Sequence, residues 1–174
     1  MPSHTLPIIA IITGTFLSGA SLSNSWFSLP ILIKTLSPLN VGNKLQHFSL
    51  MQAYADPIFP LTAITTSLLH WTCSYRRWAS DGGAWEGFAW AGAATFCMIP
   101  YSLVVVFPTV WKIEAVQRKV EKTESDGEDK WMDAEVEEAR VLLQRWNAQH
   151  VVRGFMPLIG ALIGVRALSG ELGA

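Results

Sequence analysis

The chain has 174 residues, of which 50% are hydrophobic and 16% are charged, and its formal net charge at pH 7 is −1. This composition is unusual for a soluble domain, and the balance of charge excludes the strongly basic surface with which proteins bind nucleic acid. Ten of the fourteen acidic residues and six of the thirteen Lys and Arg lie between Trp111 and Arg140, so the rest of the chain consists of long apolar runs. The pattern predicts an integral membrane protein with no room for a separate soluble catalytic domain.

Four apolar stretches are long enough to cross a bilayer core of about 30 Å as helices. They cover residues 6–33, 48–73, 83–110 and 148–169. We therefore predict an all-α fold in which residues 1–174 form one domain, a multi-pass four-helix transmembrane bundle with a soluble acidic segment over 112–145. Most Lys and Arg flank the first and third connections, so the positive-inside rule places both termini away from the cytosol.

The first span contains GTFLSGASLS, in which Gly14, Ser18 and Ser21 recur at a spacing that lets helix backbones approach closely in lipid. Gly19 is offset from this row by one position. We expect the span to be central in the bundle and its small residues to serve packing alone. The span is also expected to be retained, because no Lys or Arg precedes it and its apolar run exceeds the 7–15 residues or so of a signal peptide.

Prolines interrupt all four predicted spans. They include Pro30 in the first, Pro57 and Pro60 in the second, Pro100 and Pro108 in the third, and Pro157 in the last. Each leaves a carbonyl without its amide partner, which a membrane tolerates only where neighbouring groups or water satisfy it. Pro30 is expected to kink or end the first helix before Lys34. Asp56 precedes Pro57, and an acid in or near the hydrocarbon costs a few kcal/mol even on the gentler insertion scales, so it is a candidate functional residue.

The acidic segment contains the motif SDGE, which is typical of a capping box, over Ser125–Glu128. We predict that an amphipathic cytosolic helix begins at about Asp126 and continues into the last span. A calcium site over Asp126–Asp133 is the alternative, but the spacing of the acids misses the EF-hand pattern. A solvated acidic helix is the better interpretation.

The last span begins with RWNAQHVVRGFMP. At about 100° per residue, Trp146, His150 and Arg153 fall on one helical face, with Asn147 at its margin. In the competing interpretation, Arg153 extends its guanidinium to the lipid headgroups. Twelve residues separate Arg153 from Arg166, and these correspond to about 18 Å of helix, less than the bilayer core. We therefore expect Arg153 to face the interior of the bundle.

Four costly polar groups lie at a similar depth when residues are counted from the charge that flanks each span, about 12–18 Å inward. They are Asn24, Asp56, Tyr101 and Arg153, while His47, Tyr54 and His150 lie on the way in from the cytosolic surface. This matching depth predicts a shared pocket with aromatic walls for a flat, amphipathic ligand that partitions from the membrane. A purely structural ion pair between Asp56 and Arg153 is the alternative.

Three stretches resemble the anthrone oxygenase family of fungal polyketide pathways. They are LPIIAIITGTFLSGASLS (Leu6–Ser23), PYSLVVVFPT (Pro100–Thr109) and LLQRWNAQHVVRGFMPLIGALIGVRAL (Leu142–Leu168). The resemblance implies an enzyme of the endoplasmic reticulum membrane that oxidises an anthrone, an aromatic polyketide, to an anthraquinone. It also implies molecular oxygen as co-substrate and no metal or flavin cofactor. The sequence contains no Gly-rich nucleotide loop and no HExxH motif.

The implied reaction begins when a base removes a proton from the activated ring carbon. The anion then passes an electron to oxygen, and the peroxide that forms loses water. His150 is the candidate base, because the ordinary pKa of histidine, about 6.5, lies near working pH. Arg153 would hold the oxyanion. The candidate substrate-binding residues are Trp146, which would stack on the rings, and Asn24, Tyr54, Tyr101 and Asn147.

The sequence leaves three roles open for Asp56. It could orient His150, neutralise Arg153, or act as the acid–base residue of another reaction. The family often has a histidine in this stretch, so a second hypothesis is a polyketide cyclase, isomerase or epoxide hydrolase that uses the same pocket. A third hypothesis is a non-catalytic membrane adaptor or small transporter whose acidic helix docks a partner.

Overall fold

The computed structural model describes residues 4–37, 40–80, 83, 85–126 and 132–172, and these residues contain helices and no strand. The elements in chain order are α1 (Thr5–Ser23), the π-helix η1 (Asn24–Ser28), α2 (Leu29–Lys34), α3 (Val41–Ala79), α4 (Trp85–Phe96), α5 (Met98–Tyr101), the π-helix η2 (Ser102–Val106), α6 (Phe107–Asp126) and α7 (Met132–Leu172). The all-α prediction is confirmed for this part of the chain.

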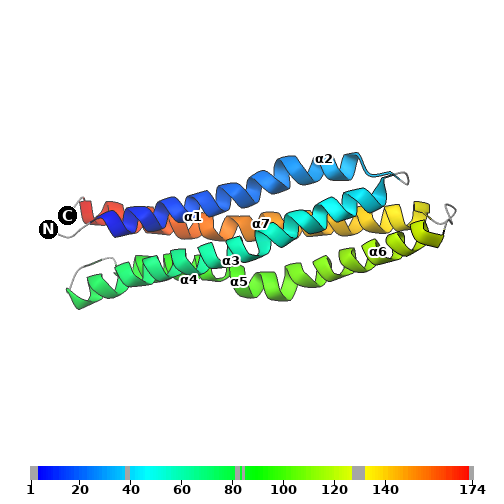
Figure 1. Cartoon of the computed structure of the whole chain (residues 1–174). Helices are drawn as coiled ribbons and strands as arrows, with labels where there is room; N and C mark the ends of the chain where they lie inside the picture. Colours follow the sequence, from blue (N-terminus) through cyan, green and yellow to red (C-terminus); the bar gives the residue numbers. More distant parts are fainter. Residues whose placement is uncertain (1–3, 38–39, 81–82, 84, 127–131, 173–174) are drawn as a thin grey trace.

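The elements form four long helical segments that lie side by side in an elongated bundle (Figure 1). The first consists of α1, η1 and α2, the second of α3, the third of α4 to α6, and the fourth of α7. The start of α1 and the end of α7 lie at one end (Figure 1). We call the opposite end, where α6 ends and α7 begins, the charged end. Both α3 and α7 contact all three other segments, so these two helices are the central elements of the bundle.

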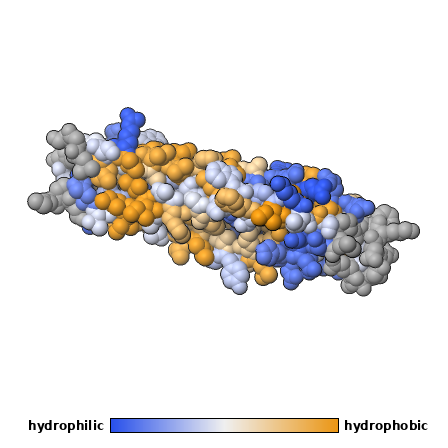
Figure 2. Space-filling model, turned by 90° about the horizontal axis from the view of Figure 1, so that it is seen from above, coloured by the Kyte–Doolittle hydropathy of each residue, from blue (hydrophilic) through white to orange (hydrophobic). Residues whose placement is uncertain are grey.

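Three of the four segments are long and apolar enough to cross a membrane, namely Thr5–Lys34, Trp85–Thr123 and Asp133–Gly170. The second segment, α3, is less apolar because many of its inward-facing residues are polar, including Gln52, Thr66, Ser67 and His70. Large apolar side chains are exposed along the outside of the bundle, among them Phe16, Trp26, Phe27, Ile58, Leu61 and Val104. Figure 2 shows this hydrophobic surface, with hydrophilic residues gathered towards the charged end.

The predicted helix start at Asp126 is wrong. Ser125 and Asp126 belong to α6, and the next helix begins at Met132; the rest of the SDGE motif, 127–128, lies outside the described residues. The reason is an apolar stripe that continues from the third predicted span, in which Ile113, Val116 and Val120 are fully buried or nearly so. This stripe packs on α7 and stabilises α6 beyond the predicted end of that span.

Two of the prolines follow π-helical segments. η1 ends two residues before Pro30, and η2 ends two residues before Pro108. A proline removes one backbone donor and crowds the preceding turn, and a π-turn accommodates this disturbance without ending the helix. Pro30 therefore does not end the helix before Lys34, because the chain passes through the π-bulge at Asn24–Ser28 and continues as a helix to Lys34. Pro57, Pro60 and Pro157 lie inside continuous α-helices.

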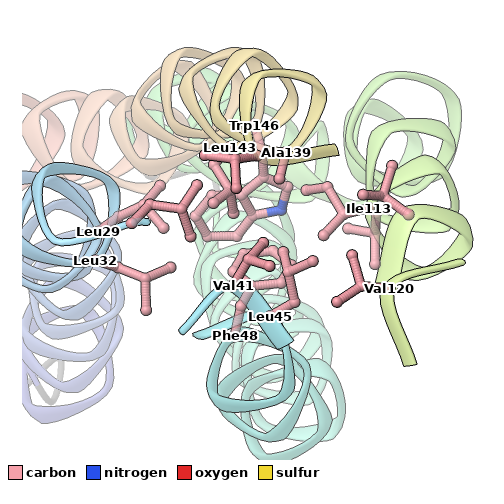
Figure 3. Close-up of a cluster of buried hydrophobic side chains, with 14 of the residues drawn as sticks. Leu29, Leu32, Val41, Leu45, Phe48, Ile113, Val120, Ala139, Leu143 and Trp146 are labelled. Carbon is pink, nitrogen blue, oxygen red and sulfur yellow. The ribbon is translucent and has the colours of Figure 1, made fainter. Parts of the chain in front are cut away.

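The largest apolar cluster lies towards the charged end, where α2, α3, α6 and α7 meet around Trp146 (Figure 3). Its fully buried members include Val41, Leu45, Ile113 and Leu143. Burial of each such side chain contributes about 1.5–3 kcal/mol relative to an exposed position. This cluster fixes the direction in which the polar face of α7 points.

Small residues allow the first and last segments to approach closely. Gly14, Ser18 and Ser21 are buried, which confirms that this row of α1 faces the bundle, whereas Gly19 is exposed. A methyl group added to Gly14 would already be in van der Waals contact with the Pro157 carbonyl oxygen of α7, at 3.5 Å. On α7, Gly160 is tighter still, because an added methyl carbon would lie 2.7 Å from the Ala91 carbonyl oxygen of α4 and also clash with a threonine hydroxyl.

We expect Gly160→Ala to destabilise the protein by about 1–3 kcal/mol, the usual cost of overpacking, because the obstructing atom is backbone. Gly19→Ala is the matched control, since nothing lies within 4 Å of an added methyl group there. This control should be neutral or slightly stabilising, as alanine favours a helix over glycine. Thermal unfolding of the detergent-solubilised protein measures both, and equal midpoints would contradict this packing.

Candidate active site

The polar face predicted for the last span faces the interior of the bundle. Trp146 and His150 are 0% exposed and Arg153 is 3% exposed, although all three lie on a helix whose neighbouring positions Val152 and Phe155 are exposed. The prediction that this face points inwards is confirmed, and the alternative in which Arg153 reaches the headgroups is wrong. α7 therefore carries an imidazole and a guanidinium one helical turn apart inside an apolar bundle.

His150 is held by contacts from two helices. The indole of Trp146 stacks on its ring, with 4.3 Å between ring centroids and 16° between planes. Ser21 on α1 hydrogen-bonds its Nε2 through Oγ at 3.1 Å. The Nδ1 atom is buried and has no hydrogen-bond partner among the described residues. The ring is thus fixed in orientation, while one of its nitrogens remains available to a ligand.

Arg153 lies against an aromatic ring of α3. Its Cζ atom is 5.3 Å from the centroid of the Phe59 ring, a cation–π arrangement. The same ring meets the His150 ring edge-on at 6.1 Å between centroids. The Nε atom of Arg153 is buried and has no hydrogen-bond partner in the described part of the chain. Phe59 therefore holds both polar groups in place from the opposite helix.

Asp56 interacts electrostatically with Arg153, but no direct ion pair joins the two among the residues described. Its carboxylate instead accepts a hydrogen bond from Gln52 Nε2, at 3.3 Å. The arrangement is not the tight, closed pair that a purely structural ion pair would form. Both charged groups remain accessible to a third, polar group.

Asp56 and Arg153 line one cavity of about 90 Å³, and its other walls are mostly apolar. It is lined by Asp56, Phe59, Pro60, Met98, Ile99, Ser102, Leu103, Phe107 and Arg153. Leu103, on η2, is 56% exposed, so the cavity borders the apolar outer surface. Its volume is below the roughly 300–1,000 Å³ of ligand pockets, so a multi-ring ligand requires the walls to move apart. His150 lies behind Phe59, one layer from this cavity.

A second cavity of about 210 Å³ lies between α2 and α3 nearer the charged end. Its lining consists of Ser28, Leu29, Ile31, Leu32, Lys44, His47, Phe48 and Met51. Phe48 forms its inner wall and packs edge-on against Trp146, with ring centroids 5.1 Å apart. This cavity is thus separated from His150 by two aromatic rings.

The other predicted site residues differ in exposure, and none of them lines either cavity. Tyr54 is 75% exposed and points away from the bundle, so it does not line either cavity. Tyr101 is half-buried and packs against the large apolar cluster. Asn24 and Asn147 are half-buried, and the side-chain oxygen of Asn147 has no partner within the described chain. Trp146 stacks on His150, so its ring face is already occupied.

Sequence reasoning missed two residues that hold the site together. Ser21 was grouped with the small packing residues, although it is the hydrogen-bond partner of His150. Phe59 gives no signal in a sequence rich in aromatic residues, yet it contacts both His150 and Arg153. Spacing along one helix cannot indicate a partner on another helix, so neither role was predictable.

The described residues contain no group of three or more His, Cys, Asp or Glu side chains that could hold a metal ion. A helical bundle with a buried imidazole and guanidinium near an apolar cavity is the arrangement expected of a protein that acts on a hydrophobic small molecule.

Comparison with known proteins gives the family. The family model for anthrone oxygenase matches residues 48–163. Anthrone oxygenase AgnL2 of Paecilomyces divaricatus is 36% identical over 94% of this chain and 95% of its own length. Monooxygenase hypC of Dothistroma septosporum is 32% identical over 92% of this chain and 80% of its own. Anthrone oxygenase tpcL of Aspergillus fumigatus is 31% identical over 98% and 100%.

The chain belongs to the anthrone oxygenase family. It is therefore an oxidoreductase of the monooxygenase type, and the hypothesis of a non-catalytic adaptor is set aside. No solved structure matches the chain.

We expect Trp146→Ala to lower the free energy of unfolding by about 3–5 kcal/mol, because it removes the side chain on which both Phe48 and His150 pack. Trp111→Ala is the matched control, since Trp111 is 61% exposed. Denaturation of the purified protein in detergent measures the difference. Equal stabilities of the two variants would contradict the packing role of Trp146.

Proposed function

We propose that this chain is a membrane-embedded oxygenase that oxidises an anthrone-type aromatic polyketide to a quinone with molecular oxygen and without a metal or organic cofactor. The observation that carries the proposal is the buried pair of His150 and Arg153 on one face of α7, beside an apolar cavity, in a member of the anthrone oxygenase family. A flat aromatic substrate fits apolar walls, and a few polar groups orient its oxygens.

We propose that all four helical segments cross the membrane as a single domain, with the charged end in the cytosol and both termini on the other side, in the endoplasmic reticulum. Three segments have the length and hydropathy for this. For α3, the support is the sorting of its side chains along the middle of the helix, where Leu50, Ile58, Leu61 and Leu68 are exposed while Gln52, Thr66, Ser67 and His70 are buried. Lys and Arg are more frequent at the charged end, as the positive-inside rule requires.

In this proposal His150 is the general base. In the tautomer that carries its hydrogen on Nε2, Ser21 Oγ accepts that hydrogen, and the lone pair of Nδ1 is then free to take a proton from the ring carbon opposite the substrate carbonyl. Phe59 stands between His150 and the cavity, so the substrate reaches Nδ1 when this ring moves aside. Trp146 stabilises the protonated imidazole from the stacked position.

Arg153 holds the negative charge that develops on the substrate oxygen. Its guanidinium is fixed over Phe59 and has an unpartnered Nε–H, so it presents a donor that needs no reorganisation as the anion forms. Asn24, Asn147 and Tyr101 line neither cavity, so they would orient other oxygens of the substrate only after the cavity walls have moved apart. Tyr54 faces outwards and contacts only a substrate that is still outside the bundle.

The reaction balances without an external reductant. Proton loss from the CH₂ group of the anthrone gives an electron-rich anion, which transfers an electron to oxygen and then combines with the superoxide to form a peroxide. The protonated base returns its proton to the peroxide, and elimination of water leaves the second carbonyl of the quinone. One molecule of oxygen is consumed, one of its atoms appears in the quinone, and the other appears in water.

Replacing His150 by alanine should lower kcat about 10²–10⁴-fold, the usual contribution of a general base. Arg153→Lys should lower it about 10²-fold, because lysine keeps the charge but loses the planar donor. The measurement is oxygen uptake and quinone absorbance in microsomes supplied with a polyhydroxylated anthrone. Arg145→Ala is the control, since Arg145 is exposed on the same helix. Full activity of both site variants, with correctly folded protein, would show that this is not the active site.

A second candidate reaction is favoured by Asp56, which lines the cavity directly, whereas His150 lies behind Phe59. In that reading Asp56 is the acid–base residue of a polyketide cyclase, isomerase or epoxide hydrolase. Oxygen dependence separates the two reactions. We expect no product from the anthrone under argon and full turnover when oxygen is restored. Turnover of a polyketide under argon that Asp56→Asn abolishes would support the second reaction instead.

A further inference from the structure

Two helices place polar residues opposite each other between the cavity and the charged end. On α3 these are Ser49, Gln52 and Asp56, and on α6 they are Glu114, Gln117 and Glu121. In each set the spacing is three and then four residues, which puts its members on one helical face. We call these six residues the polar path.

Hydrogen bonds join the polar path along and across the helices. Ser49 Oγ donates to Gln117 Oε1 at 2.5 Å, which links α3 to α6. Gln117 Nε2 donates to Glu121 Oε1 at 2.8 Å. Nearer the cavity, Gln52 Nε2 donates to Asp56 Oδ1 at 3.3 Å. The hydrogen bonds therefore form two stretches, one from the surface carboxylate of Glu121 to Ser49 and one from Gln52 to the carboxylate that lines the cavity.

Exposure falls along the polar path as far as Gln52 and rises again at Asp56, which is half-buried beside the cavity. Glu121 is exposed, Gln117 and Ser49 are half-buried, and Gln52 is 4% exposed. The carbonyl oxygen of the Gln52 side chain is buried and lacks a hydrogen-bond partner among the described residues. A purely structural amide would have both ends satisfied. The free acceptor of Gln52 lies at the step where no direct bond connects it to Ser49, which is where a water molecule would complete the path.

The charges around Asp56 come from two helices. Arg153 of α7 and Glu114 of α6 both interact electrostatically with its carboxylate. Met98–Val106, the α5 and η2 stretch that also borders the cavity, contains Tyr101 as its single titratable residue. Asp56 thus stands between a cation on the cavity side and an acid on the side of the charged end. Its state of protonation changes the charge available to hold a substrate anion at Arg153.

We propose that the polar path exchanges protons between Asp56 and water at the charged end, with Gln52 and Ser49 as positioning residues. The inference rests on the proposed function, because it gives the path a task in that reaction. The oxidation neither gains nor loses a proton overall, but one leaves the substrate before oxygen adds and one returns to the peroxide. His150 carries this proton in the proposed reaction, and Asp56 sets the charge beside Arg153. The polar path lets Asp56 exchange its own proton with water at the charged end, while the apolar substrate stays out of water.

The first test is Gln52→Leu, measured by kcat, KM and their pH dependence in membranes, with anthrone as the substrate. We expect kcat to fall by about tenfold, less than for loss of the base itself, and KM to stay unchanged, because Gln52 does not line the cavity. The acidic limb of the kcat profile should move to higher pH, since the amide no longer stabilises the ionised carboxylate. The solvent deuterium isotope effect on kcat should rise. Gln46→Leu, at an exposed position of the same helix, is the control.

The second test uses variants of Ser49, so it can be carried out even if Gln52→Leu does not fold. Ser49→Ala should slow turnover and raise the isotope effect, and Ser49→Thr, which keeps the hydroxyl, should restore both. The proposal is overturned if Ser49→Thr is as impaired as Ser49→Ala, or if the pH profile and isotope effect of Gln52→Leu match those of the Gln46→Leu control. Either result would leave the proposed function standing, provided that His150→Ala remains inactive. Full activity of His150→Ala would instead remove the proposed active site.

Discussion

The structure depends on the burial of one guanidinium. Arg153 lies inside a bundle whose surface and core are predominantly apolar, and an ionised group in such surroundings costs several kcal/mol unless its charge is compensated. Compensation comes from the face of the Phe59 ring and from the charge of Asp56, both on α3. α3 must therefore keep one fixed rotation and height relative to α7. The large apolar cluster around Trp146 enforces that register, and so does Gly164 of α7, where an added methyl carbon would lie 2.9 Å from the His70 ring of α3.

The backbone around the same site is irregular. η1 begins three residues after Ser21, η2 contributes Ser102 and Leu103 to the cavity wall, and Pro57 and Pro60 flank Phe59 on α3. π-turns and helix-internal prolines rotate the following side chains out of the regular 100° progression and free backbone carbonyls. Three of the four segments thus depart from ideal geometry near the residues that meet Arg153 and His150. Regular helices would be easier to pack, so we attribute these irregularities to the requirements of the site and not to the packing of the bundle.

Helical periodicity predicted the inward face of α7, because Trp146, His150 and Arg153 lie within one narrow arc of a single helix. Counting from the flanking charges also predicted that Asp56 and Arg153 lie at one level, since rise per residue is constant. The depth of a residue along its span does not indicate the direction in which it points around the helix axis, and for this reason the position of Tyr54 was predicted wrongly. Two residues before Asp56, it is turned by about 200° from an inward-facing position and therefore points outwards. The extension of α6 was missed because charged residues surround its buried valines, and average hydropathy conceals a stripe.

The position of Leu103 determines the route by which a substrate reaches the cavity and the concentration that governs its binding. The cavity that holds Asp56 and Arg153 borders an apolar outer surface, and Leu103 and Val104 are exposed at that border. A bundle set in a bilayer would then draw its ligand sideways, from the acyl chains, by two-dimensional diffusion. The relevant concentration is the mole fraction of ligand in lipid, so added lipid or detergent dilutes the substrate even when the total amount per volume is constant. Sparingly soluble aromatic compounds, which accumulate in membranes, are concentrated by this arrangement before they meet the protein.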